Sequence, residues 1–422
     1  MKQFYTILML LVAILATNTA AQAQTTTCNG VRYVTKTFTV NTAPTTVQYG
    51  RNTALNGTVK QLRMDIYQPD GDVATNRPVL MFAFGGSFIG GTRTDATVVQ
   101  VCKAFAARGY VTCAIDYRIY DGIPIPLPDS NKFAHLVVKA VADVKAAARY
   151  LRKTAANGNP YRINPEIILA GGISAGGIAT IHAAYLRDVT DAPALIQGFL
   201  ASNGGIHGNT DDPAGSAMMY SDSINGVVNY FGGLYRKEML DAGEVPLVSI
   251  HGTADNIVPY YYGYANVGGT NIITINGSGR NHPRADAMNV PNRLITVPGG
   301  GHGDFLTNAM WTDSMDVTST RFMYDNVLCK TVSTYAAEQG ATFTLQPNPS
   351  NTAFTLQISD VTDAYTVQLT DLTGRTLYES TALRNATHTV ETADLPNGTY
   401  IATVRFRNAA LRPIANKIVV LH

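Results

Sequence analysis

Ser174 is the first residue whose position in the sequence points to chemistry. It is the centre of Gly172-Ile173-Ser174-Ala175-Gly176, between an apolar run at Ile167–Ala170 and a helical run that begins at Ile178. A serine on such a sharp strand-to-helix turn has a strained backbone, which its glycine neighbours tolerate, and its hydroxyl stands above the sheet. The start of the helix also favours negative charge. We therefore predict that Ser174 is a nucleophile; a mere tight turn is the alternative.

A nucleophilic serine needs a base, and the base needs an acid that orients it. Two later apolar runs, Leu247–Ile250 and Leu294–Val297, are each followed by a loop, and these loops carry Asp255 and His302. We predict that His302 takes the proton of Ser174 and that Asp255 holds the imidazole in the required tautomer.

The same segments contain rivals for these roles. His182 lies eight residues into the helix that follows the serine, where a side chain is expected to face the core. Asp304 follows the candidate base by two residues but has no strand of its own before it. His251 shares a loop with the candidate acid and is expected to be structural.

The oxygen of an attacked carbonyl becomes negative and needs preorganised donors. One donor is expected to be the backbone N–H of Ala175, directly after the nucleophile. The others are expected in the glycine-rich loop that follows the apolar run Pro78–Phe84, from Gly85, Gly86 and Ser87. A flexible loop without a role is the alternative. A phosphate site is disfavoured because no Gly-Lys-Ser/Thr follows the glycines.

These candidates need a scaffold that brings them to one edge. Continuous apolar runs, typical of strands covered on both faces, alternate with helical runs such as Val137–Leu151, which ends before Asn157-Gly158-Asn159-Pro160. This alternation predicts an α/β fold with a mostly parallel sheet flanked by helices. We also expect antiparallel edge strands at Thr37–Val40 and Leu62–Tyr67. Ligands of such sheets bind outside the carboxyl ends of the strands.

Residues 60–305 resemble the α/β-hydrolase superfamily, and most closely its carboxylesterases and hormone-sensitive-lipase-like esterases. The resemblance rests on the serine motif, on the order Ser174, Asp255, His302, and on Asp116-Tyr117-Arg118. Phe84 replaces the histidine of that family's oxyanion loop and Ser87 its third glycine. Because the donors are backbone groups, the hole can survive both changes.

Two segments of this region have no assigned role in the motif. The stretch from Tyr260 to Arg284 is rich in tyrosine and glycine, and either lines an acyl or aryl pocket or packs against itself. Residues Asp212 to Ala242 are expected to form a partial cap.

The last part of the chain has a different pattern. Tyr400, Ala402 and Val404 alternate with more polar positions, and turn signals separate this run from others like it, which predicts a small β-sandwich. The motifs Leu345-Gln346-Pro347-Asn348-Pro349 and Leu395-Pro396-Asn397-Gly398-Thr399-Tyr400 resemble those of the type IX secretion sorting domain. The resemblance implies a Bacteroidetes-type bacterium, export across the outer membrane, contact with that secretion machinery and removal of the domain. A carbohydrate-binding or adhesive module is the alternative.

The beginning of the chain reads as a signal peptide. Lys2, a short apolar run and Ala21-Gln22-Ala23 predict cleavage after residue 23 and passage through the periplasm of a Gram-negative cell; an uncleaved anchor is the alternative. The predicted organisation is therefore a signal peptide at 1–23, a catalytic domain at 24–337 and a sorting domain at 342–422.

Four cysteines remain after this cleavage. Helix and strand lengths favour a disulfide between Cys102 and Cys113, which leaves Cys28 to pair with Cys329; four free thiols are the alternative. No spacing suits a metal, so neither a metal nor a cofactor is expected.

Composition excludes further classes. The chain has 422 residues, 45% of them hydrophobic and 15% charged, and Lys+Arg 32 nearly balance Asp+Glu 30 for a net charge of +2. Such balance disfavours a nucleic-acid-binding protein, and no later segment is apolar enough to span a membrane.

We therefore expect a secreted or cell-surface serine ester hydrolase. Its substrates would be acetyl or feruloyl esters on polysaccharide, or short acyl esters in general. A prolyl-oligopeptidase-like peptidase and a non-catalytic binding protein with the same fold are the alternatives.

Overall fold

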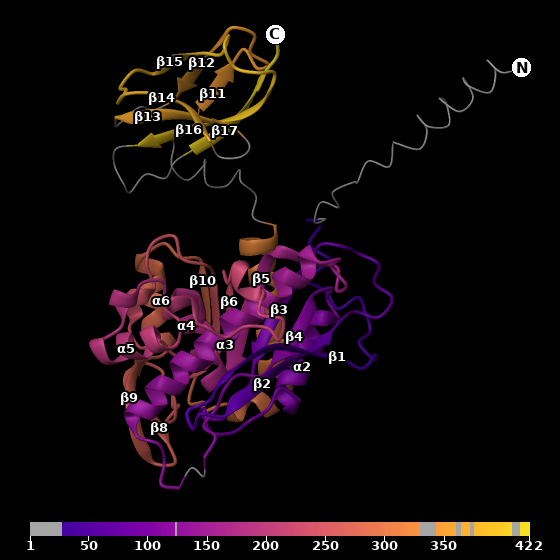
Figure 1. The fold of residues 1–422 in the computed structure, drawn as a ribbon, viewed down its shortest axis with the longest axis vertical. Coiled ribbons are helices and arrows are strands. Elements are labelled where there is room, and N and C mark those ends of the chain that lie inside the picture. The colour runs from indigo at the N-terminus through magenta and orange to yellow at the C-terminus, as the bar shows by residue number, and fades with distance from the viewer. Residues whose placement is uncertain (1–27, 123–124, 330–342, 360–363, 372–374, 407–413) are drawn as a thin grey trace, which may run out of the picture. The chain divides into compact units, whose positions relative to one another are not determined.

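A computed structural model describes residues 28–122, 125–329, 343–359, 364–371, 375–406 and 414–422 (Figure 1). The predicted signal peptide and the expected domain boundary near residue 340 lie outside these ranges. The chain divides into two compact units, residues 1–330 and 331–422.

The larger unit is built on one sheet of eight strands, in the order β1-β2-β4-β3-β5-β6-β7-β10. Every neighbouring pair from β4 to β10 is parallel, whereas β1 with β2 and β2 with β4 are antiparallel. The bounds are β1 Thr45–Thr53, β2 Val59–Tyr67, β3 Arg77–Ala83, β4 Val111–Ile115, β5 Ile163–Ile173, β6 Val227–Tyr230, β7 Leu247–Gly252 and β10 Asn292–Val297.

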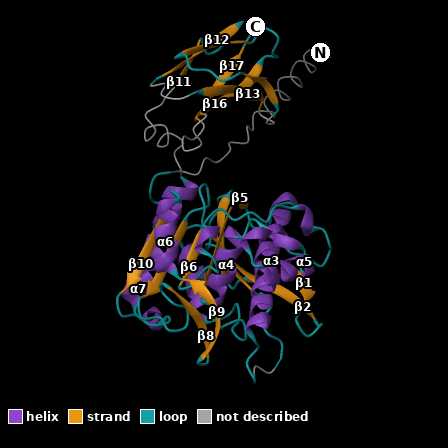
Figure 2. Cartoon of the chain, turned by 90° about the vertical axis from the view of Figure 1, so that its left-hand side faces the viewer, coloured by secondary structure: helices purple, strands orange, loops and turns teal. Residues whose placement is uncertain are grey.

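Six helices accompany this sheet in the described part of the chain. Helices α2 and α7 contact each other, as do α3 and α4, which lie together on one side of the sheet (Figure 2). Their bounds are α2 Ala96–Ala106, α3 Ser130–Ala156, α4 Ala175–Tyr185, α5 Ala194–Ser202, α6 Ser278–Ala287 and α7 Ala309–Met323. The predicted α/β fold with a mostly parallel sheet is confirmed.

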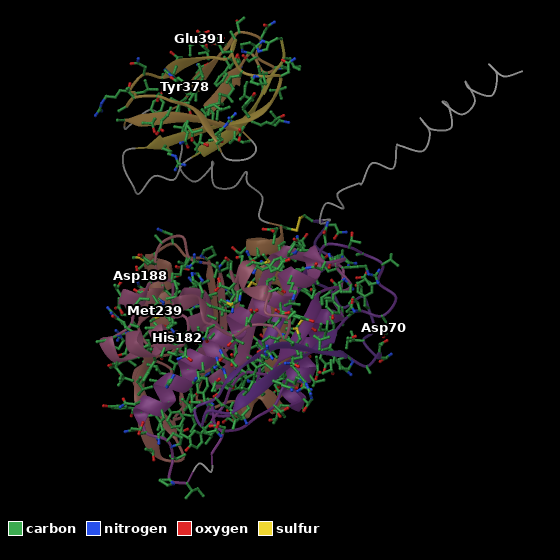
Figure 3. All side chains as sticks on the ribbon, in the orientation of Figure 1. Asp70, His182, Asp188, Met239, Tyr378 and Glu391 are labelled. Carbon is green, nitrogen blue, oxygen red and sulfur yellow. A yellow bond between two sulfur atoms is a disulfide. The ribbon has the colours of Figure 1, made fainter. Side chains whose placement is uncertain are left out.

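The continuous apolar runs follow from this layering. All residues of β3 and β4 are buried, because helices cover both faces of the sheet. Side chains fill the space between the layers (Figure 3). Helix α3 begins at the N-cap Asp129, whose carboxylate accepts from Lys132 N–H, and ends before Asn157 as predicted.

Two expected elements were wrong, one of them only in part. Thr37–Val40 is not a strand; the edge strand is β1, eight residues further along, while Leu62–Tyr67 does lie in β2. Residues 212–242 are only in part the expected partial cap: they contain β6, a fully buried interior strand of the sheet, and beyond it Tyr235 and Met239 line the pocket described below. With four residues between loops, β6 is too short to give a periodic signal.

The disulfide prediction was half right. Cys28 and Cys329 are bonded, whereas Cys102 and Cys113 are buried free thiols. Thr112 Oγ1 donates to the carbonyl oxygen of Cys102 at 2.9 Å, so it is Thr112 that points toward α2. Because neighbouring residues of a strand point to opposite faces, Cys113 points away from α2. The lengths of the helix and strand segments showed that the two backbones can approach each other. They did not show toward which face of β4 each side chain points.

The smaller unit is a β-sandwich. One sheet has the order β11-β12-β15 and the other β14-β13-β16-β17, with antiparallel pairing throughout. Apolar side chains of both sheets, such as Leu356, Val367 and Val404, form its core. The bounds are β11 Phe343–Gln346, β12 Ala353–Ile358, β13 Tyr365–Asp371, β14 Thr376–Glu379, β15 Thr387–Glu391, β16 Gly398–Phe406 and β17 Ile414–Val420.

None of the helices among the described residues combines the length and the apolar character needed to cross a membrane.

Candidate active site

Ser174 occupies the sharp turn between β5 and α4. Its φ is 52° and its ψ −114°, a strained backbone for a residue with a side chain. Its N–H donates to Tyr230 O, and its carbonyl oxygen accepts from Ile178 N–H in the first turn of the helix. The flanking glycines are required by space, because a Cβ on Gly172 would lie 2.4 Å from the backbone carbon of Gly176. The turn is therefore held from the strand side and the helix side.

The three residues of the predicted triad form one chain of hydrogen bonds. Ser174 Oγ lies 2.9 Å from Nε2 of His302, and Nδ1 of the same ring lies 2.8 Å from Oδ2 of Asp255. Asp255 follows β7 and His302 follows β10, and parallel pairing of these strands brings both loops to one edge of the sheet. Since Nδ1 faces a carboxylate and Nε2 faces a hydroxyl, the ring is oriented to accept the serine proton at Nε2.

Asp255 is buried and fully hydrogen-bonded. Burial by itself would raise its pKa, but hydrogen bonds from His251 and His302 and from the N–H of Ile257 outweigh burial and lower the pKa to about 2. Its second oxygen, Oδ1, accepts from the N–H groups of Ile257 and Val258. The acid therefore stays ionised.

His251 contributes to this environment, although its nearness to Asp255 in the chain was the one feature that pointed to it. Its Nε2 lies 3.3 Å from Asp255 Oδ2 and 3.0 Å from Val258 O, and its Nδ1 lies 3.0 Å from Ser278 Oγ. We expected His251 to be structural only, but it contacts the candidate acid directly.

The imidazole of His302 is supported by an aromatic ring. Phe231, directly after β6, meets it edge to face at 4.9 Å. Gly303 has a φ of 75°, and a Cβ there would lie 2.9 Å from Phe231. Asp304 does not contact the imidazole; its Oδ2 accepts from Gly301 N–H within the loop. Asp304 therefore stabilises the conformation of the loop and does not orient the base.

The predicted oxyanion loop lies against the serine turn. A Cβ on Gly85 would be 3.3 Å from Ile173 O and 3.4 Å from the Cβ of Ser174. Gly86 has a φ of 120°, and its carbonyl oxygen accepts from the N–H groups of Ile89 and Gly90. Ser87 has a φ of 55°. The loop is thus a tight turn beside the start of α4, where Ala175 begins the helix.

Phe84, the residue that replaces a histidine, supports the base of this loop. Its ring stacks on Tyr117 with a centroid distance of 4.3 Å, and Tyr117 donates its hydroxyl to Phe84 O at 2.8 Å. The aromatic pair holds the backbone position of the loop without a polar ring.

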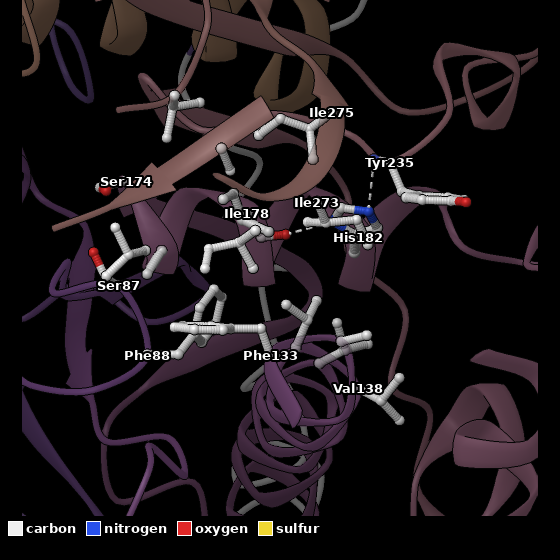
Figure 4. A pocket seen from close by; sticks show the side chains of 18 of the residues that line it. Ser87, Phe88, Phe133, Val138, Ser174, Ile178, His182, Tyr235, Ile273 and Ile275 are labelled. Atoms are coloured by element: carbon white, nitrogen blue, oxygen red, sulfur yellow. Dashed lines mark hydrogen bonds between the residues drawn. The ribbon is translucent and has the colours of Figure 1, made fainter. Parts of the chain in front are cut away.

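An apolar pocket of about 90 Å³ opens at Ser174. Figure 4 shows Ser87 and Ser174 at one end, His182 and Tyr235 at the other, and Ile178 between them. His182 is therefore not a base for the serine. Its Nδ1 donates to Ile178 O and its Nε2 accepts from Tyr235 N–H. Burial lowers the pKa of its imidazole to about 4.

The tyrosine-rich stretch forms a hairpin, β8 Tyr262–Val267 and β9 Thr270–Asn276. The stretch was expected either to line a pocket or to pack against itself. It does line the pocket, but not with its tyrosines. Tyr262 and Tyr264 are more than half exposed, whereas Ile273 and Ile275 line the pocket.

Within the described residues, no group of three or more His, Cys, Asp or Glu side chains is placed to hold a metal ion.

Comparison with known proteins finds two matching families. Residues 64–241 match the BD-FAE family, and residues 344–420 match the family described as secretion system C-terminal sorting domain. No curated protein matches the chain. Among solved structures, propionate-bound esterase 2 of Thermogutta terrifontis is 20% identical, with a TM-score of 0.47 over 68% of this chain and 96% of that chain. The apo form of that esterase is 22% identical, with a TM-score of 0.47 over 68% and 96% of the two chains.

Proposed function

We propose that this chain, an esterase-like α/β-hydrolase with a type IX sorting domain, is an exported serine hydrolase of carboxylic esters. The observation that carries the proposal is the hydrogen-bond chain from Ser174 through His302 to Asp255, at 2.9 and 2.8 Å. Its position at the carboxyl edge of a parallel sheet, beside a glycine-rich turn, adds support.

The reaction follows from the roles of these groups. Ser174 Oγ attacks the ester carbonyl carbon while His302 Nε2 takes the serine proton, and the ionised Asp255 stabilises the resulting imidazolium. Backbone N–H groups of Ala175 and of the loop at Gly85–Ser87 stabilise the oxyanion. Collapse of the tetrahedral intermediate breaks the ester C–O bond, and His302 returns the proton to the leaving alcohol.

Water completes the cycle by the same route in reverse. His302 takes a proton from water, hydroxide attacks the acyl carbon, and the proton returns to Ser174 as the carboxylic acid leaves. The net reaction converts one ester and one water into one acid and one alcohol. None of these steps uses a metal or cofactor.

The sorting domain indicates export, with secretion or attachment at the cell surface. We infer that the substrate is therefore met outside the cell, as a free ester or as an acyl group on a polysaccharide. The proposed reaction is compatible with this location, because its only second substrate is water.

A fluorophosphonate probe tests the proposal. We expect covalent labelling of the intact protein and none of Ser174→Ala, with labelling strongly slowed in His302→Ala because the serine loses its base. Circular dichroism would check that both variants fold. Equal labelling of the wild type and Ser174→Ala would overturn the proposal. An unlabelled wild type would favour a binding protein, and faster cleavage of peptide amides than of esters would favour a peptidase.

A further inference from the structure

The pocket beside Ser174 runs along helix α4. Its lining includes Ser174, Ile178 and His182, which succeed each other by one helical turn (Figure 4). At 1.5 Å per residue, the span from Ser174 to His182 is about 12 Å. Ile178 lies about 6 Å from Ser174 along this axis, so it lines the part of the pocket that a short acyl chain would reach.

The walls offer little polarity to a ligand. Both ring nitrogens of His182 are used by backbone groups, as described above. The side chain of Asn266 is used within the hairpin, where it accepts from Gly269 N–H and donates to Asn271. The other side chains along the pocket are mainly aliphatic, and Met239 is among them. Such a surface binds hydrocarbon.

The position of the base decides which half of an ester enters. The leaving oxygen must be reached by His302 Nε2, which protonates it. The pocket lining contains no residue of the loop 299–308 that carries His302, and it begins instead at Ser87, Ala175 and Ile178. The alcohol therefore leaves on the side of His302, and the acyl group points into the pocket.

The hairpin β8–β9 lines this pocket. Ala265 pairs with Ile273, and both line the pocket, whereas Tyr264 pairs with Thr274 and neither is part of the lining. The hairpin is fixed at its base, because Leu234 and Asn276 exchange backbone hydrogen bonds. Ser130 Oγ also donates to Ile272 O at 2.6 Å. The wall is therefore anchored to the sheet loops and to α3.

The volume limits the length of the acyl chain. An apolar cavity of about 150 Å³ accepts benzene, so about 90 Å³ corresponds to roughly four aliphatic carbons. We propose that the pocket under hairpin β8–β9 selects esters of short, unbranched aliphatic acids of about four carbons, and that Ile178 and Ile275 set this limit. This inference rests on the proposed function. It disfavours feruloyl esters, whose ring exceeds the pocket.

A series of p-nitrophenyl esters with one leaving group tests the selection. We expect kcat/KM to be about fifteenfold higher for butanoate than for acetate, because each of the two additional buried methylenes contributes about fourfold. Octanoate and ferulate should be at least tenfold slower than butanoate. Equal rates for acetate and butanoate, or a maximum at octanoate or ferulate, would overturn the acyl-pocket proposal.

Two opposite variants separate selection from general damage. Ile275→Ala should enlarge the pocket and move the maximum to a longer chain, whereas Ile178→Phe should lower the butanoate-to-acetate ratio about tenfold by filling it. Thr274→Val, on the same strand but outside the pocket lining, should keep the wild-type profile. An unchanged profile in both isoleucine variants would overturn the proposal.

Fluorophosphonate labelling of the same samples keeps the two proposals distinguishable. Wild-type labelling with a contrary chain-length profile overturns the pocket alone. Absence of Ser174-dependent labelling overturns both.

Discussion

The carboxylate of Asp255 determines how the proposed triad responds to pH. Burial disfavours its charge, but its hydrogen bonds with His251 and His302 hold its pKa at about 2. Asp255 therefore remains ionised at every pH at which the protein is expected to work. Loss of activity in acid must then come from protonation of the imidazole that faces Ser174, because a protonated ring cannot accept the serine proton.

We expect kcat/KM for p-nitrophenyl butanoate to fall about tenfold per pH unit on the acid limb of the pH profile, since only the neutral imidazole accepts the serine proton. Initial rates between pH 4 and 9 would measure this. The buried His182 and His282 have pKa values of about 4, so a profile governed by either of them would fall near that pH instead. A limb centred near pH 4, or a flat profile to that pH, would contradict the role of His302.

Single residues with strong local constraints were the easiest part of the site to predict. Ser174 could be found because its strained turn needs glycine neighbours, which leave a short pattern in the sequence. His251 could not be ranked, because its importance depends on a 3.3 Å contact with Asp255 that burial creates. The tyrosines of β8 were noticed for their size, although the smaller isoleucines of β9 line the pocket.

At the level of elements, helix α7 carries an unfavourable buried charge. Asp316 is 5% exposed, and burial raises its pKa to about 6 despite the nearby cations Arg108 and Lys36 and a hydrogen bond with Tyr230. The unfolded chain releases this proton near pH 3.8, its usual value, and the folded chain near 6. The folded state thus holds more protons between these values, and stability falls as the pH rises through them.

We therefore expect Asp316→Asn to stabilise the larger unit at pH 8 by up to about 3 kcal/mol, from two pKa units at about 1.4 kcal/mol each. At pH 4 the variant and the wild type should be nearly equal. Fluorescence of Trp311, the single tryptophan of the chain, follows urea unfolding of this unit alone, because it lies on α7. Destabilisation at pH 8, or equal gains at both pH values, would show that the carboxylate has a structural role.

Long buried strands and the long helix could be predicted because their patterns repeat. The predicted run Leu247–Ile250 lies within β7, and the end of α3 was marked by Asn157. The failures are short or irregular: β6 has four residues, and Thr37–Val40 lacks a partner strand. Pairing with neighbours, rather than local preference, decides whether such segments join a sheet.

At the level of the whole molecule, the two units have independent interiors. The apolar core of the larger unit is built from residues 33–329 and that of the smaller from residues 343–420. The disulfide between Cys28 and Cys329 joins the two ends of the larger unit without involving the smaller one. Neither core would lose a described member if the chain were cut near residue 340.

Because the two cores are independent, the larger unit should remain folded and active when the sorting domain is removed. We expect the exported protein, recovered from the medium of a Bacteroidetes-type host, to end near residue 340, because a sorting signal is dispensable after export and the larger core is complete without it. Intact mass spectrometry would locate the end, and esterase assays should give the same kcat/KM for the exported and full-length forms. An exported chain that still carries His422 would contradict removal. A processed form with lost activity would instead show that the smaller unit contributes to catalysis, which a triad and a pocket built wholly from residues of the larger unit do not require.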